Sequence, residues 1–176
     1  LKGDEVADYS HNYTLGTAVI KTTTFFIYTD NQPASTAASD AAMISSETYK
    51  GSLTTPPALN AGIQSRTYYL GAKGEEVADY SHNFGTISGG TWGVKSTSFF
   101  YYDVEGVAMR AGVEGVTSDS KMVRSDSYKG EMVAEDASKL QSKTYYFGLK
   151  GDEVADYSHN YTLGTAVIKT TTFFIY

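Results

Sequence analysis

A chain of 176 residues is long enough for one ordinary domain, or for two small domains with modest cores. Its formal net charge is -6 and its lysines and arginines are scattered, which disfavours a nucleic-acid surface because phosphate binding needs a basic stripe. Cysteine is absent and no apolar run approaches the ~20 residues that cross a bilayer, so neither disulfides nor membrane insertion are expected.

The composition favours short strands joined by tight turns, because 15 tyrosines and 17 glycines occur beside abundant serine and threonine. In chain order, Val6 to Tyr13 has a weak strand pattern, since Ala and Asp are poor strand formers. Lys21 to Tyr28 is β-branched and aromatic throughout and is predicted as a strand. Gln64 to Leu70 alternates, which places the adjacent Tyr68 and Tyr69 on opposite faces.

An internal repeat dominates the sequence. Leu1 to Tyr28 and Leu149 to Tyr176 share LKGDEVADYSHNYTLGTAVIKTTTFFIY without a difference, at an offset of 148 residues. A diverged copy lies between them, with KGEEVADYSHN at Lys73 to Asn83 and KSTSFFYY at Lys95 to Tyr102. In repeat proteins, neighbouring copies cover one another's edges and apolar faces, so such arrays need several units to be stable.

The 148-residue unit divides into two half-units, residues 1–71 and 72–148, and residues 149–176 begin the next copy of the first half-unit. Two further blocks recur in both half-units: Met43 to Gly51 (MISSETYKG) with Met122 to Gly130 (MVRSDSYKG), and Ile63 to Gly71 (IQSRTYYLG) with Leu140 to Gly148 (LQSKTYYFG). Length differences fall between the blocks, which identifies the spacers as loops. We therefore predict an all-β fold in which tandem antiparallel β-hairpin or meander repeats stack as a solenoid, a spiral or a fibre-forming sheet.

Short tyrosine motifs recur along the whole chain. Tyr-Tyr-x-Gly occurs at Tyr68 to Gly71 and at Tyr145 to Gly148, and Ala-Asp-Tyr ends at Tyr9, Tyr80 and Tyr157. In these motifs the chain resembles the tyrosine-rich tandem β-hairpin repeats of very large bacterial surface proteins, the YD or Rhs-like repeats. It departs from their pattern because the usual Tyr-Asp-x-x-Gly-Arg run is missing. The resemblance implies a long spiral of β-hairpins that builds a shell, a stalk or a fibre.

Three histidines, His11, His82 and His159, occupy one equivalent position in Asp-Tyr-Ser-His-Asn. A Ser-His-Asp mechanism needs converging groups and an oxyanion hole, whereas strand alternation sends Ser10 and His11 to opposite faces. Each copy offers one histidine with an Asp and an Asn nearby, so a metal site would require stacked copies to align their histidines. We predict no catalytic residue, no metal site and no cofactor, and do not expect an enzyme.

The acidic motif Lys-Gly-Asp/Glu-Glu stands at Lys2 to Glu5, Lys73 to Glu76 and Lys150 to Glu153. Its glycine permits a positive φ and its charges favour water, so the motif predicts a tight turn between strands. An interaction motif is the alternative, although the alternating carboxylates of a calcium loop are absent.

Trp92, Tyr101 and Tyr102 are the candidate ligand-facing aromatics, because aromatic rings on an exposed face can form sugar-stacking platforms. Adjacent tyrosines in a strand point to opposite sides, so one member of each pair is predicted to lie in the core or an interface.

The predicted function is a structural repeat segment of an extracellular bacterial filament, tube or surface stalk, which self-assembles through β-strand pairing between repeats. Since both ends share one sequence, each can occupy the same environment, either within one continuous array or by strand exchange between subunits. The chain starts at Leu1 and stops at Tyr176 inside a strand-like run, so we expect it to be part of something longer. The predicted assembly strands contain Val19, Lys21, Phe25, Phe26, Tyr28, Val167, Lys169, Phe173, Phe174 and Tyr176.

The expected partners are other copies of the chain, or neighbouring repeats of the same chain, with glycans as a further possibility and no nucleic acid. A cysteine-free, tyrosine-rich composition fits an extracellular or cell-surface location on a bacterium. The alternative function is an adhesin or carbohydrate-binding surface module, in which the loops Thr29 to Ala42 and Asp103 to Lys121 bind the ligand.

Overall fold

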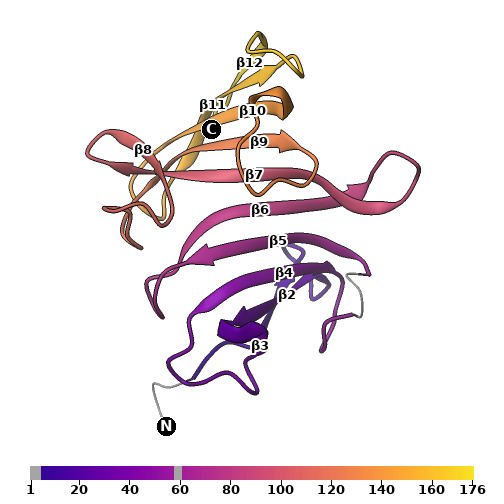
Figure 1. The fold of residues 1–176 in the computed structure, drawn as a ribbon. Coiled ribbons are helices and arrows are strands. Elements are labelled where there is room, and N and C mark those ends of the chain that lie inside the picture. Colours follow the sequence, from indigo (N-terminus) through magenta and orange to yellow (C-terminus); the bar gives the residue numbers. More distant parts are fainter. Residues whose placement is uncertain (1–4, 58–60) are drawn as a thin grey trace.

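A computed structural model describes residues 5–57 and 61–176 of the chain. These residues form one open sheet of 12 strands in which every pair is antiparallel, with the main path β1-β2-β4-β5-β6-β7-β9-β10-β11-β12 (Figure 1). Spatial order therefore follows chain order, as in a meander. The all-β antiparallel architecture expected from the sequence is confirmed.

The strands are β1 (Tyr9–Tyr13), β2 (Ile20–Tyr28), β3 (Gln32–Pro33), β4 (Met43–Lys50), β5 (Ile63–Leu70), β6 (Val77–Thr86), β7 (Trp92–Val104), β8 (Val107–Arg110), β9 (Met122–Lys129), β10 (Leu140–Phe147), β11 (Val154–Tyr161) and β12 (Ile168–Phe173). Two short 3-10 turns, η1 (Thr29–Asn31) and η3 (Ala137–Lys139), lie in the spacers. The predicted strands at residues 21–28 and 64–70 are β2 and β5, whereas the weak pattern at residues 6–13 yields the shorter β1. None of the described helical segments is long and apolar enough to span a bilayer.

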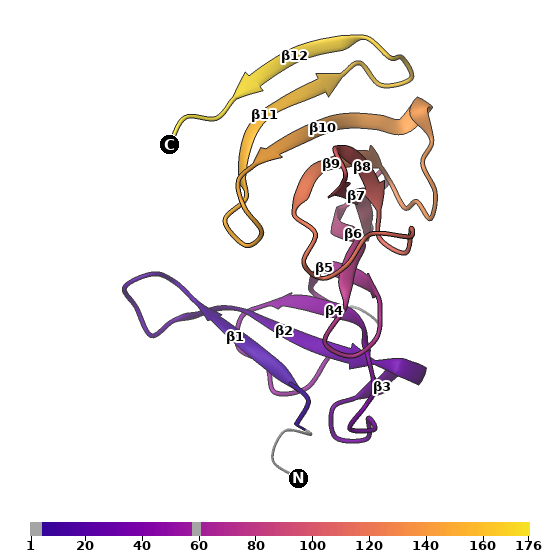
Figure 2. The same cartoon turned by 90° about the vertical axis from the view of Figure 1, so that its left-hand side faces the viewer.

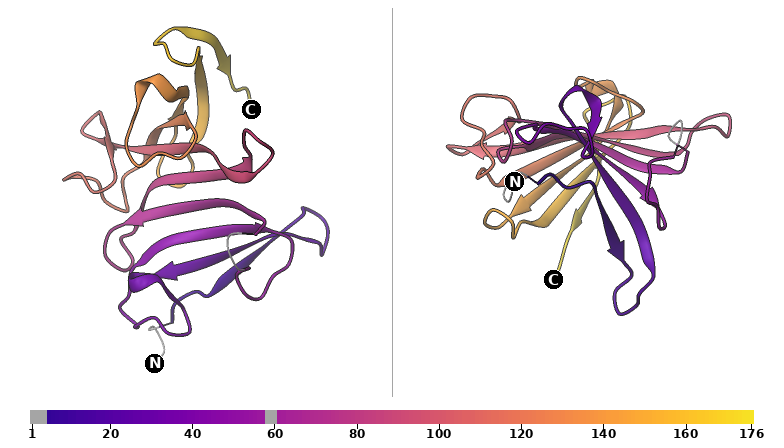
Figure 3. Two further views of the ribbon diagram at one scale, coloured as in Figure 1. Left: turned by 45° about the vertical axis from the view of Figure 1, so that its right-hand side comes forward. Right: turned by 90° about the horizontal axis from the view of Figure 1, so that it is seen from below.

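Bulges recur at equivalent places in the sheet. The pairing register shifts after Asn12, Asn83 and Asn160 in the strands that share the Ser-His-Asn sequence. A bulge increases the local right-handed twist of a strand pair. The strands accordingly fan about the long axis of the sheet, and β1 and β12 lie at its opposite ends (Figures 2 and 3).

The two faces of the sheet differ in chemistry. On one face, hydroxyl side chains meet across neighbouring strands: Thr24 with Thr48 at 3.0 Å between their Oγ1 atoms, and Thr67 with Ser81 at 3.2 Å. The opposite face bears two buried aromatic clusters, one around Tyr49 in the first half-unit and one around Phe99 in the second. Alternation places Tyr68 against Tyr80 on the face with these two clusters, whereas the Tyr69 hydroxyl contacts Ser46 on the other face.

Spacers after β4 and β9 fold back over the aromatic face. Leu53 packs against the first aromatic cluster, and Met132 lies within the second. The longer spacer at residues 103–121 contains β8, which pairs with the end of β7 and was not predicted from the sequence. These segments give a single-layered sheet the cover that a second sheet supplies in a sandwich.

Candidate functional site

Aromatic stacking joins the half-units across the sheet. Tyr68 of β5 stacks on Tyr80 of β6, with ring centroids 4.5 Å apart and an interplanar angle of 23°. Tyr145 of β10 stacks on Tyr157 of β11 in the same way, at 4.6 Å and 19°. The junction between the first two half-units is therefore repeated between the second half-unit and the third copy.

A capping glutamate accompanies each of these junctions. Glu76 accepts hydrogen bonds from the backbone N–H groups of Gly74 and Met43, at 2.8 and 3.0 Å. Glu153 accepts the equivalent pair from Gly151 and Met122, at the same two distances. The carboxylate closes the turn and ties it to the start of an earlier strand.

The acidic motif therefore forms a turn in its second and third copies, as predicted, whereas Lys2 to Glu5 falls mostly outside the described residues. The turn also depends on the preceding glycine. Gly71 and Gly148 have φ of 128° and 135°, and a Cβ at either position would collide with the backbone carbonyl of residue 75 or 152.

A buried threonine forms hydrogen bonds with each loop that covers the aromatic face, after β4 and after β9. The Thr23 hydroxyl donates to the Gly51 carbonyl at 2.8 Å and accepts from the Leu53 N–H at 3.0 Å. Thr97 makes the same two bonds, to the Gly130 carbonyl at 2.9 Å and from the Met132 N–H at 3.0 Å. One hydroxyl thus satisfies a donor and an acceptor that would otherwise be buried unpaired.

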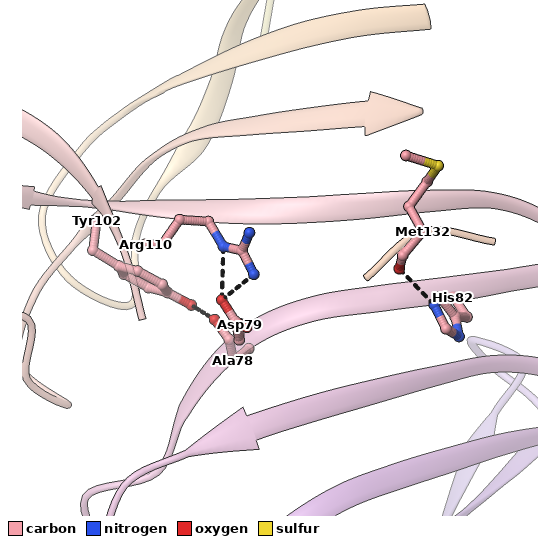
Figure 4. Close-up of polar contacts among 6 residues, drawn as sticks. All are labelled: Ala78, Asp79, His82, Tyr102, Arg110 and Met132. Carbon is pink, nitrogen blue, oxygen red and sulfur yellow. Dashed lines mark hydrogen bonds and ion pairs between the residues drawn. The ribbon is translucent and has the colours of Figure 1, made fainter. Parts of the chain in front are cut away.

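Two of the three repeated histidines contact these same loops. A His11 ring nitrogen lies 3.1 Å from the Leu53 carbonyl, and the buried His82 ring nitrogen lies 3.2 Å from the Met132 carbonyl (Figure 4). His159 instead contacts Thr171 Oγ1 at 3.0 Å. Each histidine is thus occupied within its own copy.

The neighbours of His82 do not converge on it. Asp79 forms an ion pair with Arg110 at 2.6 Å (Figure 4), and Ser81 accepts a hydrogen bond from Thr67 on the opposite face. Across residues 5–57 and 61–176, no group of three or more His, Cys, Asp or Glu side chains is arranged to hold a metal ion.

The two sets of predicted assembly residues lie in unlike surroundings although their sequences match. Phe25 and Tyr28 of β2 are 3% and 6% exposed, whereas Phe173 and Tyr176 are 71% and 83% exposed. The difference arises because β2 lies between β1 and β4, while β12 pairs with β11 alone among the described strands. The other members differ less. Phe26 is half-buried where Phe174 is exposed, whereas Val19 and Val167 are equally exposed and Lys21 and Lys169 are both exposed.

The three candidate ligand-facing aromatics differ in solvent exposure. Trp92 is 54% exposed, whereas Tyr101 and Tyr102 are buried, so the prediction that all three face a ligand is wrong for both tyrosines. Tyr101 belongs to the aromatic cluster around Phe99. Tyr102 packs with Val77 and Ala111, and its hydroxyl donates to the Ala78 carbonyl at 2.7 Å (Figure 4). Loops that fold over both faces, and β8, account for their burial.

Trp92 lies beside a groove at the junction of the first two half-units. The groove has a volume of about 410 Å³, and its walls include Arg66, His82, Phe84 and Glu131. The indole N–H of Trp92 donates to the Ile63 carbonyl at 3.1 Å, which fixes the ring at the rim. An ordered aromatic beside charged side chains suits a polar ligand that also has an apolar face.

The next junction has an equivalent groove with different chemistry. It is about 480 Å³ in volume and is lined by Lys143, Tyr161 and Ala166 among others. Ala166 occupies the position that corresponds to Trp92 in the alignment of the copies. Of these two junctions, the tryptophan therefore lies beside the groove at the first and is replaced by alanine at the second.

Comparison with known proteins returns no matching family model, no similar curated protein and no similar solved structure.

Proposed function

We propose that the chain is a structural repeat segment of an extracellular bacterial filament, tube or surface stalk, in which copies of the module pair edge to edge through their β-strands. The observation that carries this proposal is the repetition of the junction. Tyr68–Tyr80 and Tyr145–Tyr157 stack alike, and Glu76 and Glu153 cap alike. The second half-unit joins the first through the same contacts by which the third copy joins the second. Further copies can therefore be added in the same way.

The properties of such an array follow from the sheet. Main-chain hydrogen bonds between antiparallel strands resist extension across the sheet, and cross-strand side-chain pairs add about 0.2–1 kcal/mol each. The loops that cover the aromatic face limit the apolar surface open to further association. The array is therefore expected to grow along one axis.

A surface location on a bacterium is supported by two features. The module has a cysteine-free, tyrosine-rich composition, which fits a bacterial surface protein. Its tyrosine motifs resemble the tandem repeats of large bacterial surface proteins. Antibodies raised against residues 103–121 should label intact cells that make the protein, whereas labelling only after permeabilisation would contradict this location.

The array proposal is tested by adding copies. Proteins in which the 176-residue chain is extended by one, two and three further 148-residue units should be measured by small-angle scattering and electron microscopy. The proposal predicts that maximum dimension rises by a constant increment per unit while cross-section stays constant. Particles that become rounder with each added unit would contradict it.

The groove beside Trp92 supports a second candidate function, carbohydrate binding by an adhesin. The matched variant is Trp92→Ala, because alanine is the natural residue at the equivalent Ala18 and Ala166. A glycan array should show binding by the unmodified chain that Trp92→Ala abolishes. Equal signals from both proteins, or none from either, would reject the groove as a sugar site.

A further inference from the structure

Strand β12 has the sequence of β2, and β2 shows what covers such a strand. The outer edge of β2 pairs with β4, with Thr24 opposite Thr48 and Phe26 opposite Ser46. The Phe25 ring meets Tyr49 edge to face at 6.0 Å, and Thr23 binds the loop at Gly51. The surface that complements this sequence is therefore β4 together with the loop that follows it.

Strand β12 lacks this cover among the described residues. Its polar side chains accordingly have other hydrogen-bond partners than their equivalents in the first copy. In the first copy, Thr23 binds the Gly51 carbonyl and His11 contacts the Leu53 carbonyl. In the third copy, the equivalent Thr171 and His159 contact each other at 3.0 Å. Two side chains that bind a loop in one copy thus pair together where no described loop reaches them.

We propose that the β11–β12 hairpin of one chain docks on β4 and residues 51–53 of a second copy of the chain, in place of that copy's β1–β2 hairpin. This proposal rests on the proposed function and names the joint between separate chains. In the joint, Phe173 takes the position of Phe25 against Tyr49, and Thr171 takes the two hydrogen bonds of Thr23. Strand addition of this kind uses main-chain pairing for affinity and side-chain pockets for specificity.

Edge-to-edge contact between β12 and β1 does not reproduce any pairing seen in the sheet. The strands equivalent to β1 are β6 and β11, and their outer neighbours are β5 and β10 rather than a strand of the β2 type. Because β12 has the sequence of β2, the pairing register between β2 and β4 is the one that β12 can adopt with a β4 strand.

The resident hairpin and the docked hairpin are expected to bind β4 with similar free energy, so a small change in either one shifts the exchange. Each joint replaces a β1–β2 hairpin by a hairpin of identical strand sequence, so the hydrogen bonds and ring packing of the joint repeat those of the resident hairpin. Association itself costs translational and rotational freedom. The unmodified chain is therefore capped by its own β1–β2 hairpin, and a small weakening of that hairpin favours the joint.

Matched threonine variants test this balance. Thr23→Val removes the two loop hydrogen bonds from the resident hairpin while Thr171 keeps the ability to form them. We expect Thr23→Val to raise the association constant, measured by sedimentation velocity, about tenfold to a hundredfold over the unmodified chain. Thr171→Val and the double variant Thr23→Val/Thr171→Val should associate no more than the unmodified chain. Equal association by Thr23→Val and by the double variant would overturn the proposal.

A disulfide trap tests the joint while leaving the sequence of the resident β1–β2 hairpin unchanged. The chain has no cysteine, and the Oγ1 atoms of Thr24 and Thr48 lie 3.0 Å apart, so Thr48→Cys/Thr172→Cys places sulfurs within bonding reach across the proposed joint. Strands β4 and β12 are separated by six strands of the main sheet path, so this disulfide can form only between chains.

The matched control is Ser127→Cys/Thr172→Cys, because Ser127 is the β9 equivalent of Thr48 and β9 pairs with β7, whose sequence differs from that of β12. Under mild oxidation the first pair should yield disulfide-linked dimers and longer species several times faster than the control. Equal rates for the two pairs would overturn the exchange. Constant growth of tandem chains would leave the array proposal standing in that event, so the two failures are distinguishable.

Discussion

The two half-units fill the same position of the aromatic face with different charges. In the first, Glu47 binds Arg66, with 2.6 Å between carboxylate and guanidinium, and accepts a hydrogen bond from Tyr49 at 2.7 Å. In the second, Asp126 lies between Arg124 at 2.9 Å and Lys143 at 3.4 Å. Glu47 is partly exposed, whereas Asp126 is fully buried.

Two of the substitutions between the copies add a second cation and an aromatic ring beside it. Arg124 stands where the first half-unit has Ser45, and its guanidinium lies 3.9 Å from the ring centroid of Tyr101, which replaces Ile27. Burial raises the pKa of Asp126, and the neighbouring Arg124 and Lys143 oppose that rise. The copies therefore share strand pairing and loop anchors but use separate charge arrangements, which identifies the former as the features that define the module.

Breaking the two charge arrangements should give the largest effect. Asp126→Ala leaves two cations without their carboxylate in a buried site, which we expect to cost about 3–5 kcal/mol of unfolding free energy. Glu47→Ala affects a partly exposed pair and should cost about 1–3 kcal/mol. Urea denaturation of both variants measures the comparison. Equal losses would show that the second arrangement is no more dependent on pairing than the first.

Removing the loop anchor of the second half-unit should have an intermediate effect. Thr97→Val leaves the Met132 N–H and the Gly130 carbonyl without their buried partner, at a cost of about 1–3 kcal/mol. Thermal unfolding gives the size of the loss. Unlike Thr23→Val, this variant should not increase association, because β7 has no second copy to replace it. Association by Thr97→Val would contradict the link between exchange and sequence identity.

The junctions should respond equally to loss of their tyrosine stacks. Tyr68→Leu and Tyr145→Leu each remove one ring of an offset stack, worth about 0.5–1.5 kcal/mol beyond the area buried. The main comparison is between local stabilities, which hydrogen exchange of β6 and β11 reports. A loss confined to one junction would show that the junctions are not equivalent in energy.

Acid should weaken the second junction slightly. Burial alone would raise the pKa of Glu153, but its own backbone N–H and those of Met122 and Gly151 lower it below the ordinary value. A carboxylate with a lowered pKa in the folded state stabilises the fold above the unfolded value, and that contribution disappears as pH falls through the folded value. The thermal midpoint should therefore fall by less than about 3 °C on acidification through this range. Glu153→Gln should lose this part of the pH dependence, and an unchanged profile would assign it to other groups.

Sequence periodicity predicted most of the sheet but not its irregularities. The alternation in residues 64–70 correctly separates Tyr68 from Tyr69. Strand β8 was missed because its four residues lie in a spacer that differs in length between the copies, and the pattern of so short a segment is weak. The bulges at Asn12, Asn83 and Asn160 have no period of their own, so only tertiary pairing reveals them.

The candidate site was predicted only in part. Burial of Tyr101 and Tyr102 depends on which loops fold over the sheet, and neither spacing nor composition encodes that. The loop anchors Thr23 and Thr97 were also missed, although a signal existed. Threonine occupies this position in all three copies, while its neighbours vary between Thr and Ser.

The central claim is that β12 is a β2 strand without its cover. The most direct test compares the 176-residue chain with a version extended at its C-terminus by a second copy of residues 29–71, which supplies a β4 surface in sequence. Hydrogen exchange should show backbone protection of Ile168–Phe173 rising to the level of Ile20–Phe25 in the extended chain. Protection that stays as low as in the 176-residue chain would contradict the account.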